Sequence, residues 1–265
     1  MRPKALLPLL IIAWVCGTAC AADGSSGDAP SRAHATSAPT SRPTATPLDV
    51  SAYPAGTIGY AISWPQCGAG FPDEPFDFGI IGVTNGEAFT RNPCFADEYR
   101  WAKRGAYHPS IYMNTGYIAV EAAFPECGTD DACRAYRYGW TAARNAYTYA
   151  ATVDAIAPVW WLDVQIVSDW SEQPALNAQS IRGAGDFLAS RGIRVGISST
   201  AFQWSEVAGN AQHGLPVWDA SALDADMAAV FCAEGKDFGG GDTELIAYVA
   251  EFETVLACGS VTAFR

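Results

Sequence analysis

Short apolar runs alternate along this chain with longer segments of helical composition. Each run indicates a buried or half-buried strand, because it is rich in Val, Ile and aromatic residues and is bounded by turn-forming residues. Between the runs, residues 95–104, 133–155 and 177–191 have helical composition, and Gly105 and Gly192 are typical of helix ends. The expected strands cover residues 57–63, 78–84, 110–114, 159–165, 194–199, 215–219 and 244–249.

This alternation predicts an α/β fold. Strands that alternate with helices usually form a parallel sheet, and seven or eight strands favour closure into a TIM-like (β/α) barrel. After Gly214 the helical composition fades, so we expect the last third of the barrel to be irregular, built of strands and loops. The 265 residues, of which 49% are hydrophobic, are sufficient for one large domain with its own core.

The beginning of the chain has the features of an export signal, with a basic start, an apolar centre and small residues before Cys20. Residues 17–20 resemble a bacterial lipoprotein cleavage site, in which Cys20 becomes lipidated; ordinary cleavage nearby is the alternative. We therefore expect a signal peptide over residues 1–19, a tether rich in Ala, Ser, Thr and Pro over 20–50, and the barrel domain over 51–265. The protein is then exported, either secreted or held at the extracellular face of the membrane by its lipid end alone.

Charge and cysteine content narrow the possible partners. A formal net charge of -12 argues against nucleic acid, although acidity by itself names no substrate. The expected barrel domain holds six cysteines, and in an exported chain an even number indicates disulfides. Because there is no CxxC motif and no Cys/His cluster, we expect no metal site and no cofactor. The order of the six cysteines along the chain favours disulfides that each bracket one connection between neighbouring elements. These join Cys67 with Cys94, Cys127 with Cys133, and Cys232 with Cys258.

In such a barrel the chemistry lies at the carboxyl ends of the strands. The run over 159–165 reads VWWLDVQ, so Asp163 stands near the end of a buried strand and the amide Gln165 follows two residues later. Asp163 is therefore a catalytic candidate. Tryptophans near strand ends can stack on sugar rings, and neighbouring polar groups can bind hydroxyls. The remaining candidates at strand ends and in the loops after them are Ser63, Trp64, Asn85, Asn114, Trp218, Asp219 and Glu251.

The order of these motifs resembles the glycoside hydrolase family 25 lysozymes and the exported bacterial proteins with a glycoside-hydrolase-like barrel. This resemblance spans most of the chain from residue 57 onward and implies a lysozyme-like barrel directed at cell-wall glycan or a related saccharide. The segments that carry it are GYAISWPQC at 59–67, FGIIGVTNGEAFTRNPCF at 78–95, WWLDVQ at 160–165 and GIRVGISST at 192–200.

Two positions depart from the family's pattern. In that family the first strand ends in D-x-S and the fourth in D-x-E, where the Glu is the proton donor for glycosidic cleavage. Here the same places read A-I-S and D-V-Q, so Ala61 replaces the first acid and Gln165 replaces the proton donor. An amide cannot donate a proton at a useful rate, and glycoside hydrolysis usually needs two carboxyl groups.

Three interpretations of function follow. The first is an envelope-associated, glycan-binding barrel whose hydrolytic activity is degenerate or absent. The second is an active glycoside hydrolase that uses Asp163 with Asp219, or with a late glutamate such as Glu251 or Glu253. The third is a scaffold that binds proteins, and not sugars, through the barrel rim.

Overall fold

A computed structural model describes residues 53–120 and 123–259 of the chain. The signal peptide expected over 1–19, the lipidation site Cys20 and the tether expected over 20–50 lie outside these residues, and so those predictions remain predictions. None of the helices in the described part has the length and apolar character that a membrane span requires.

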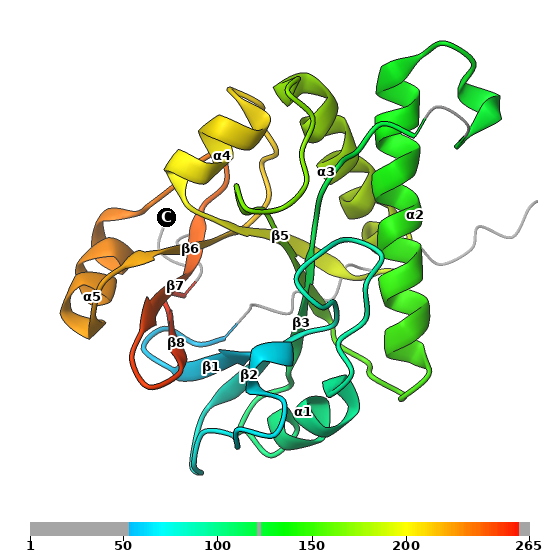
Figure 1. The fold of residues 1–265 in the computed structure, drawn as a ribbon. Coiled ribbons are helices and arrows are strands. Elements are labelled where there is room, and N and C mark those ends of the chain that lie inside the picture. Colours follow the sequence, from blue (N-terminus) through cyan, green and yellow to red (C-terminus); the bar gives the residue numbers. More distant parts are fainter. Residues whose placement is uncertain (1–52, 121–122, 260–265) are drawn as a thin grey trace, which may run out of the picture. The chain divides into compact units, whose positions relative to one another are not determined.

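Eight strands form a closed barrel in which the spatial order follows the sequence order (Figure 1). The strands from β1 to β7 pair in parallel, whereas β8 runs antiparallel to both β7 and β1 and closes the ring. The predicted TIM-like barrel is thereby confirmed. The strands are β1 (Ile58–Ile62), β2 (Phe78–Gly82), β3 (Ser110–Asn114), β4 (Val159–Asp163), β5 (Arg194–Ser199), β6 (Val217–Ala222), β7 (Thr243–Val249) and β8 (Glu253–Ala257).

Helices lie outside this ring (Figure 1). In the described residues two short 3-10 helices, η1 and η2, precede α1 and α2 respectively. The helices are η1 (Trp64–Gln66), α1 (Phe95–Ala102), η2 (Pro125–Cys127), α2 (Asp131–Ala151), α3 (Pro174–Ala189), α4 (Ala201–Ala208) and α5 (Ala225–Glu234).

The last third is irregular, but not because its helices are missing. The expectation that helices end after Gly214 is wrong for α5, an alanine-containing helix with little amphipathic pattern, and α4 was not among the expected helices. Asp224 caps α5, since its carboxylate accepts a hydrogen bond from the backbone of Met227 at 2.8 Å. The irregularity comes instead from register shifts between β6 and β7, and from a hairpin that joins β7 directly to β8.

Aromatic rings fill the barrel interior beneath its mouth. The indoles of Trp161 and Trp218 meet edge to face, with ring centroids 5.9 Å apart. Glycines on neighbouring strands leave room for such rings: a Cβ atom at Gly196 would lie 2.3 Å from the Trp161 ring, and one at Gly59 would lie 2.3 Å from Phe78. The interior is therefore a packed core, which gives the strand ends above it a rigid floor.

The two longest helices, α2 and α3, pack with their backbones in close contact. A Cβ atom at Gly139 would lie 1.8 Å from the carbonyl oxygen of Ser180, and one at Gly183 would lie 2.0 Å from that of Tyr136. Because no side chain fits at either position, this contact depends on glycine from both helices.

Three disulfides staple the barrel, and their pairing confirms the sequence prediction. Two of them span 27 and 26 residues, and the third closes a loop of 6 residues. The bonds join Cys67 to Cys94, Cys127 to Cys133, and Cys232 to Cys258.

Candidate functional site

Asp163 ends β4 and lies at the mouth of the barrel, almost fully buried at 4% exposure. The register places Asn114 of β3 and Ser198 of β5 beside it. Asn114 Nδ2 donates a hydrogen bond of 2.6 Å to Asp163 Oδ2, while Asn114 Oδ1 accepts one of 2.7 Å from Thr84 Oγ1. A chain of hydrogen bonds from the loop after β2 through β3 to β4 therefore orients the carboxylate.

Gln165 faces Asp163 from the loop that follows β4. Its Nε2 donates to both carboxylate oxygens, at 3.1 Å to Oδ1 and 2.9 Å to Oδ2. Trp170 holds the backbone of Gln165 through a 2.7 Å bond from its indole N–H to the carbonyl oxygen. The residue at the position of the family's proton donor is thus turned toward the site, but it acts there as an amide donor.

Burial raises the pKa of Asp163 to about 7. The hydrogen bonds from Gln165 and Asn114 favour the charged form, yet they offset only part of the desolvation, and the nearby carboxylate of Glu253 raises the pKa further. A carboxyl group that changes charge near neutral pH is a common feature of functional sites, although it does not define one.

Glu253 brings a second carboxyl group to the mouth. It is the first residue of β8, and the antiparallel register pairs it with Ala61 of β1. Directly opposed residues point to the same face of a sheet, and Ala61 belongs to the cluster inside the barrel. Glu253 therefore projects to the inner side, next to the position at which the family carries its first acid.

Glu253 is exposed as a residue, but the protein around its carboxyl group desolvates that group and raises its pKa to about 7. Tyr112 of β3 interacts with both acids: burial, and then the charges of Asp163 and Glu253, raise the pKa of its phenol, and the Ser63 side chain hydrogen-bonds it.

Asp219 is oriented by different neighbours. Its Oδ1 accepts a 3.0 Å bond from the backbone N–H of Ser221 and a second bond from the Ser221 hydroxyl. Burial raises its pKa, whereas Ser221 and the charge of Lys236 lower it. The carboxylate whose charge contributes to the raised pKa of Asp163 is that of Glu253. The pairing of Asp163 with Asp219 stays a prediction.

The other candidates take different places. Ser63 and Asn114 are buried beside the site, whereas Asn85 and Glu251 are exposed in the loop after β2 and in the β7–β8 turn. Trp218 is buried in the barrel, where its ring meets that of Tyr112 at a centroid distance of 6.1 Å. It belongs to the floor below the mouth and not to the rim.

Trp64 is the exposed tryptophan among the candidates, with 44% of its surface accessible at the start of η1. Further exposed apolar side chains lie in the loops that follow β2, β3, β4 and β6, at the start of α4 and at the last residue of β7, a pattern that the sequence did not predict. Loop residues carry no periodicity that would distinguish a rim from packing. These side chains, which with Trp64 we call the apolar rim, are Phe89, Ile118, Val120, Ile166, Val167, Phe202, Leu223 and Val249.

A hollow of about 250 Å³ opens at this end of the barrel, between the loops after β2, β3 and β4. Phe89 and Tyr138 line it with their rings, and Glu87 and Asp169 supply carboxylates. Another cavity, of about 750 Å³, includes Trp160 but lies toward the amino-terminal ends of the strands. We place the site at the mouth, because the interacting carboxyl groups are there.

Comparisons with known proteins give similarity in fold only. No family model matches the sequence, and no curated protein matches it. The fold is similar to the catalytic domain of endolysin ply40, from a bacteriophage of Listeria monocytogenes (12% identity, 78% of this chain, 94% of that chain, TM-score 0.49). It is also similar to GHIP, a glycosyl hydrolase 25 of Streptococcus pneumoniae (14% identity, 76% and 86% of the two chains, TM-score 0.49).

A third similar structure is the modular Cpl-1 endolysin, solved as a mutant with a peptidoglycan analogue (14% identity, 77% of this chain, TM-score 0.48). The chain spans about half the length of that protein, 55%. At these identities and TM-scores the similarity describes the barrel and says nothing about the site.

Proposed function

We propose that the barrel mouth binds a saccharide of the cell envelope and cleaves glycosidic bonds slowly or not at all. The observation that carries this proposal is the contact between Gln165 and both oxygens of Asp163. An amide occupies the place from which a glycosidase would protonate the leaving group, and an amide has no such proton to give. Asp163 is held by two amide donors, in a state suited to accepting hydrogen bonds.

The surroundings of Asp163 support a sugar as the ligand. Oriented amides and a buried carboxylate can bind hydroxyl groups, and the exposed faces of Trp64 and Phe89 can stack on pyranose rings. The choice of a cell-envelope glycan follows from the motif order of the sequence and from its export signal. We infer in addition that the protein is exported, and that lipidation of Cys20 and the tether hold the barrel near the envelope.

The test is binding of the soluble mature protein, without its leader, to purified peptidoglycan and its soluble fragments. We expect saturable binding without release of reducing sugar ends, and a roughly tenfold weaker affinity for Trp64→Ala. Tyr107→Ala, which removes an exposed ring just before β3, at the opposite end of the barrel, is the matched control and should bind as the wild type does. Rapid release of reducing ends by the wild-type protein would overturn the proposal.

A double variant, Ala61→Asp with Gln165→Glu, tests the reason for the missing hydrolysis. It restores both acids of the family's pattern on the same floor of packed rings. If these two side chains explain the loss, the variant gains turnover while the fold and the binding persist. A variant that binds and still releases no sugar would mean that other groups in the mouth also prevent hydrolysis.

A second candidate function is retained hydrolysis by Asp163 and Glu253. The observation in its favour is that Glu253 pairs in register with Ala61 and interacts with Asp163, so two carboxyl groups with pKa values near 7 share the mouth. In that case the wild type releases reducing ends and Glu253→Gln stops the release. Glu251→Gln, in the exposed turn just before β8, should leave it unchanged.

The exposed side chains of the apolar rim could instead bind a protein, and the peptidoglycan-binding test distinguishes such a scaffold from a saccharide site. Such a scaffold would bind no peptidoglycan, and Trp64→Ala would then affect only protein partners.

A further inference from the structure

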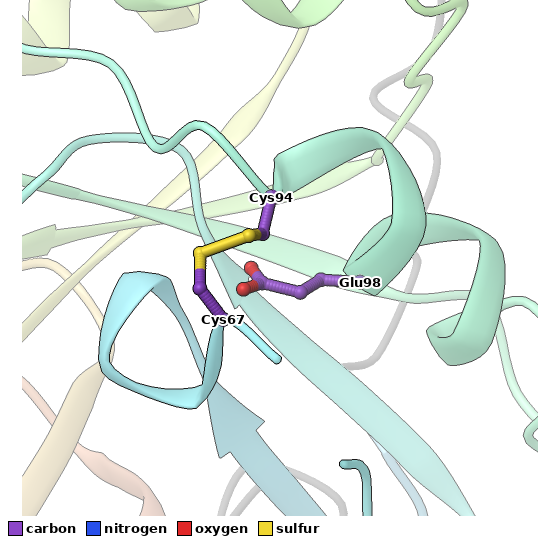
Figure 2. A group of neighbouring side chains, drawn as sticks. All are labelled: Cys67, Cys94 and Glu98. Atoms are coloured by element: carbon purple, nitrogen blue, oxygen red, sulfur yellow. A yellow bond between two sulfur atoms is a disulfide. The ribbon is translucent and has the colours of Figure 1, made fainter. Parts of the chain in front are cut away.

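One buried acid of the barrel has no part in the proposed saccharide site. Glu98 lies in α1 and points at the disulfide between Cys67 and Cys94 (Figure 2). The two sulfur atoms and a carboxylate oxygen of Glu98 all lie within 4.8 Å of one another. Both cysteines are partly exposed, so a small molecule in solution can approach the bond.

The hydrogen bonds of Glu98 are incomplete. The side chain is fully buried, at 0% exposure, and its Oε2 accepts a 2.5 Å bond from Asn92 Nδ2. Its Oε1 has no partner in the described residues. Asn92 also accepts a 2.9 Å bond from the backbone N–H of Cys94, and so it ties the carboxyl group to the start of α1. A buried polar atom without a partner is rare and costly, which suggests that its partner forms in another chemical state of the site.

We propose that the Cys67–Cys94 disulfide is a thiol–disulfide exchange site, in which Glu98 donates the proton to the departing sulfur. A low-molecular-weight thiolate attacks Cys67 Sγ and forms a new S–S bond with it. The bond between the two cysteines breaks, and its electron pair leaves on Cys94 Sγ, which takes the proton of Glu98. A second thiol then attacks the mixed disulfide, releases the Cys67 thiol and leaves as a disulfide of the two small thiols.

The direction of the exchange follows from the position of Cys94. It is the N-cap residue of α1, where the partial positive charge of the helix terminus stabilises a thiolate. Cys94 is therefore the better leaving group, and Cys67 is the sulfur that is attacked. Once Cys94 has taken the proton, its S–H group supplies the Glu98 carboxylate with the hydrogen-bond partner that the oxidised state lacks.

The charge state of Glu98 fits proton transfer near neutral pH. Burial raises the pKa of Glu98 to about 7; the hydrogen bond from Asn92 lowers it and the neighbouring Asp97 raises it. From the elements packed against α1, the titratable groups that interact with Glu98 are Tyr112 of β3 and Tyr149 of α2, whose own pKa values are raised mainly by burial. Below its pKa Glu98 holds the proton that the exchange requires.

The test is the rate at which glutathione opens each disulfide of the intact, oxidised protein, followed by alkylation and mass spectrometry of the cysteine peptides. The rate constant per glutathione thiolate should fall for Cys67–Cys94 as the pH rises through about 7. It should stay level for Cys232–Cys258, which serves as the internal reference. In Glu98→Gln we expect the rate constant for opening Cys67–Cys94 to be independent of pH and, near pH 6, about tenfold lower than in the wild type.

Glu126→Gln is the matched control, because Glu126 neighbours Cys127 of another disulfide but lies exposed. This variant should leave the opening of Cys67–Cys94 unchanged. The proposal is overturned if Glu98→Gln reacts as fast as the wild type, or if all three disulfides share one pH profile. Should Glu98→Gln fail to fold by circular dichroism, the wild-type profiles decide the question alone.

Discussion

Replacing Asp163 by Asn should change how the stability of the barrel depends on pH. Asn has nearly the shape of Asp, and Gln165 can turn its amide to match the new side chain, because the residue is only partly buried. The substitution removes a group that must lose its charge or be desolvated in the folded state. The effect is therefore expected in the pH profile of unfolding more than in its value at one pH.

The size of the effect follows from the difference between the pKa of Asp163 in the folded protein and its pKa in the unfolded chain. In the folded protein the pKa of Asp163 is about 7, and its ordinary value is 3.8. The native state thus binds the proton more tightly, so stability is greatest at low pH and decreases as the pH rises from about 4 to about 7. Between about pH 5 and about pH 8 this one group should lower the free energy of unfolding by about 2.5 kcal/mol.

The assay is urea unfolding of oxidised protein at those two pH values, for wild type and Asp163→Asn. For each protein the free energy of unfolding at about pH 8 is subtracted from that at about pH 5. The difference between the two proteins cancels the groups that titrate in both, and it should be about 2.5 kcal/mol. Asp73→Asn, at an exposed carboxyl far from β4 in sequence, is the control and should leave the difference unchanged. If the free energy of unfolding changes with pH by the same amount in wild type and Asp163→Asn, burial in the barrel does not desolvate the Asp163 carboxyl group.

Three further predictions concern the scaffold. Gly183→Ala places a Cβ atom 2.0 Å from the Tyr136 carbonyl oxygen and should lower the free energy of unfolding by about 2 kcal/mol, measured in urea; a neutral change would mean that α2 and α3 separate freely. Burial lowers the pKa of His213 from 6.5 to about 4. Its neutral form therefore stabilises the fold above pH 6.5, and this stabilisation decreases as the pH falls toward 4. His213→Gln should make the melting temperature less sensitive to acid, and a pH profile identical to that of the wild type would contradict this. Replacing Cys232 and Cys258 by Ser opens a loop of 26 residues and should lower stability by about 3.5 kcal/mol on the chain-entropy estimate; an unchanged melting temperature would argue against that staple.

Local chemistry was sufficient to predict much of the barrel. The parallel strands are short apolar runs bounded by turn residues, so their positions could be read from neighbours in the chain. The three disulfides followed from the order of the cysteines, because each joins two that are consecutive in the barrel part of the chain. Asp163 was identifiable as a site candidate from its place at the end of the VWWLD run alone.

The tertiary structure was needed wherever distant segments meet. The hairpin after β7 reverses β8, and the register of that reversal places Glu253 opposite Ala61, although 192 residues separate them in the chain. Only the same closure shows that Trp218 belongs to the interior and that the loops share an apolar rim. The orientation of Gln165 toward Asp163, and of Glu98 toward a disulfide, likewise depends on packing around the side chain.

The sequence by itself determined the seven parallel strands, the disulfides and the exchange of an acid for an amide at position 165, because these depend on residue type and on near neighbours. Only the tertiary structure decided which carboxyl groups interact and which aromatic rings reach solvent. Those properties depend on strand register and on burial, which are set when the barrel closes.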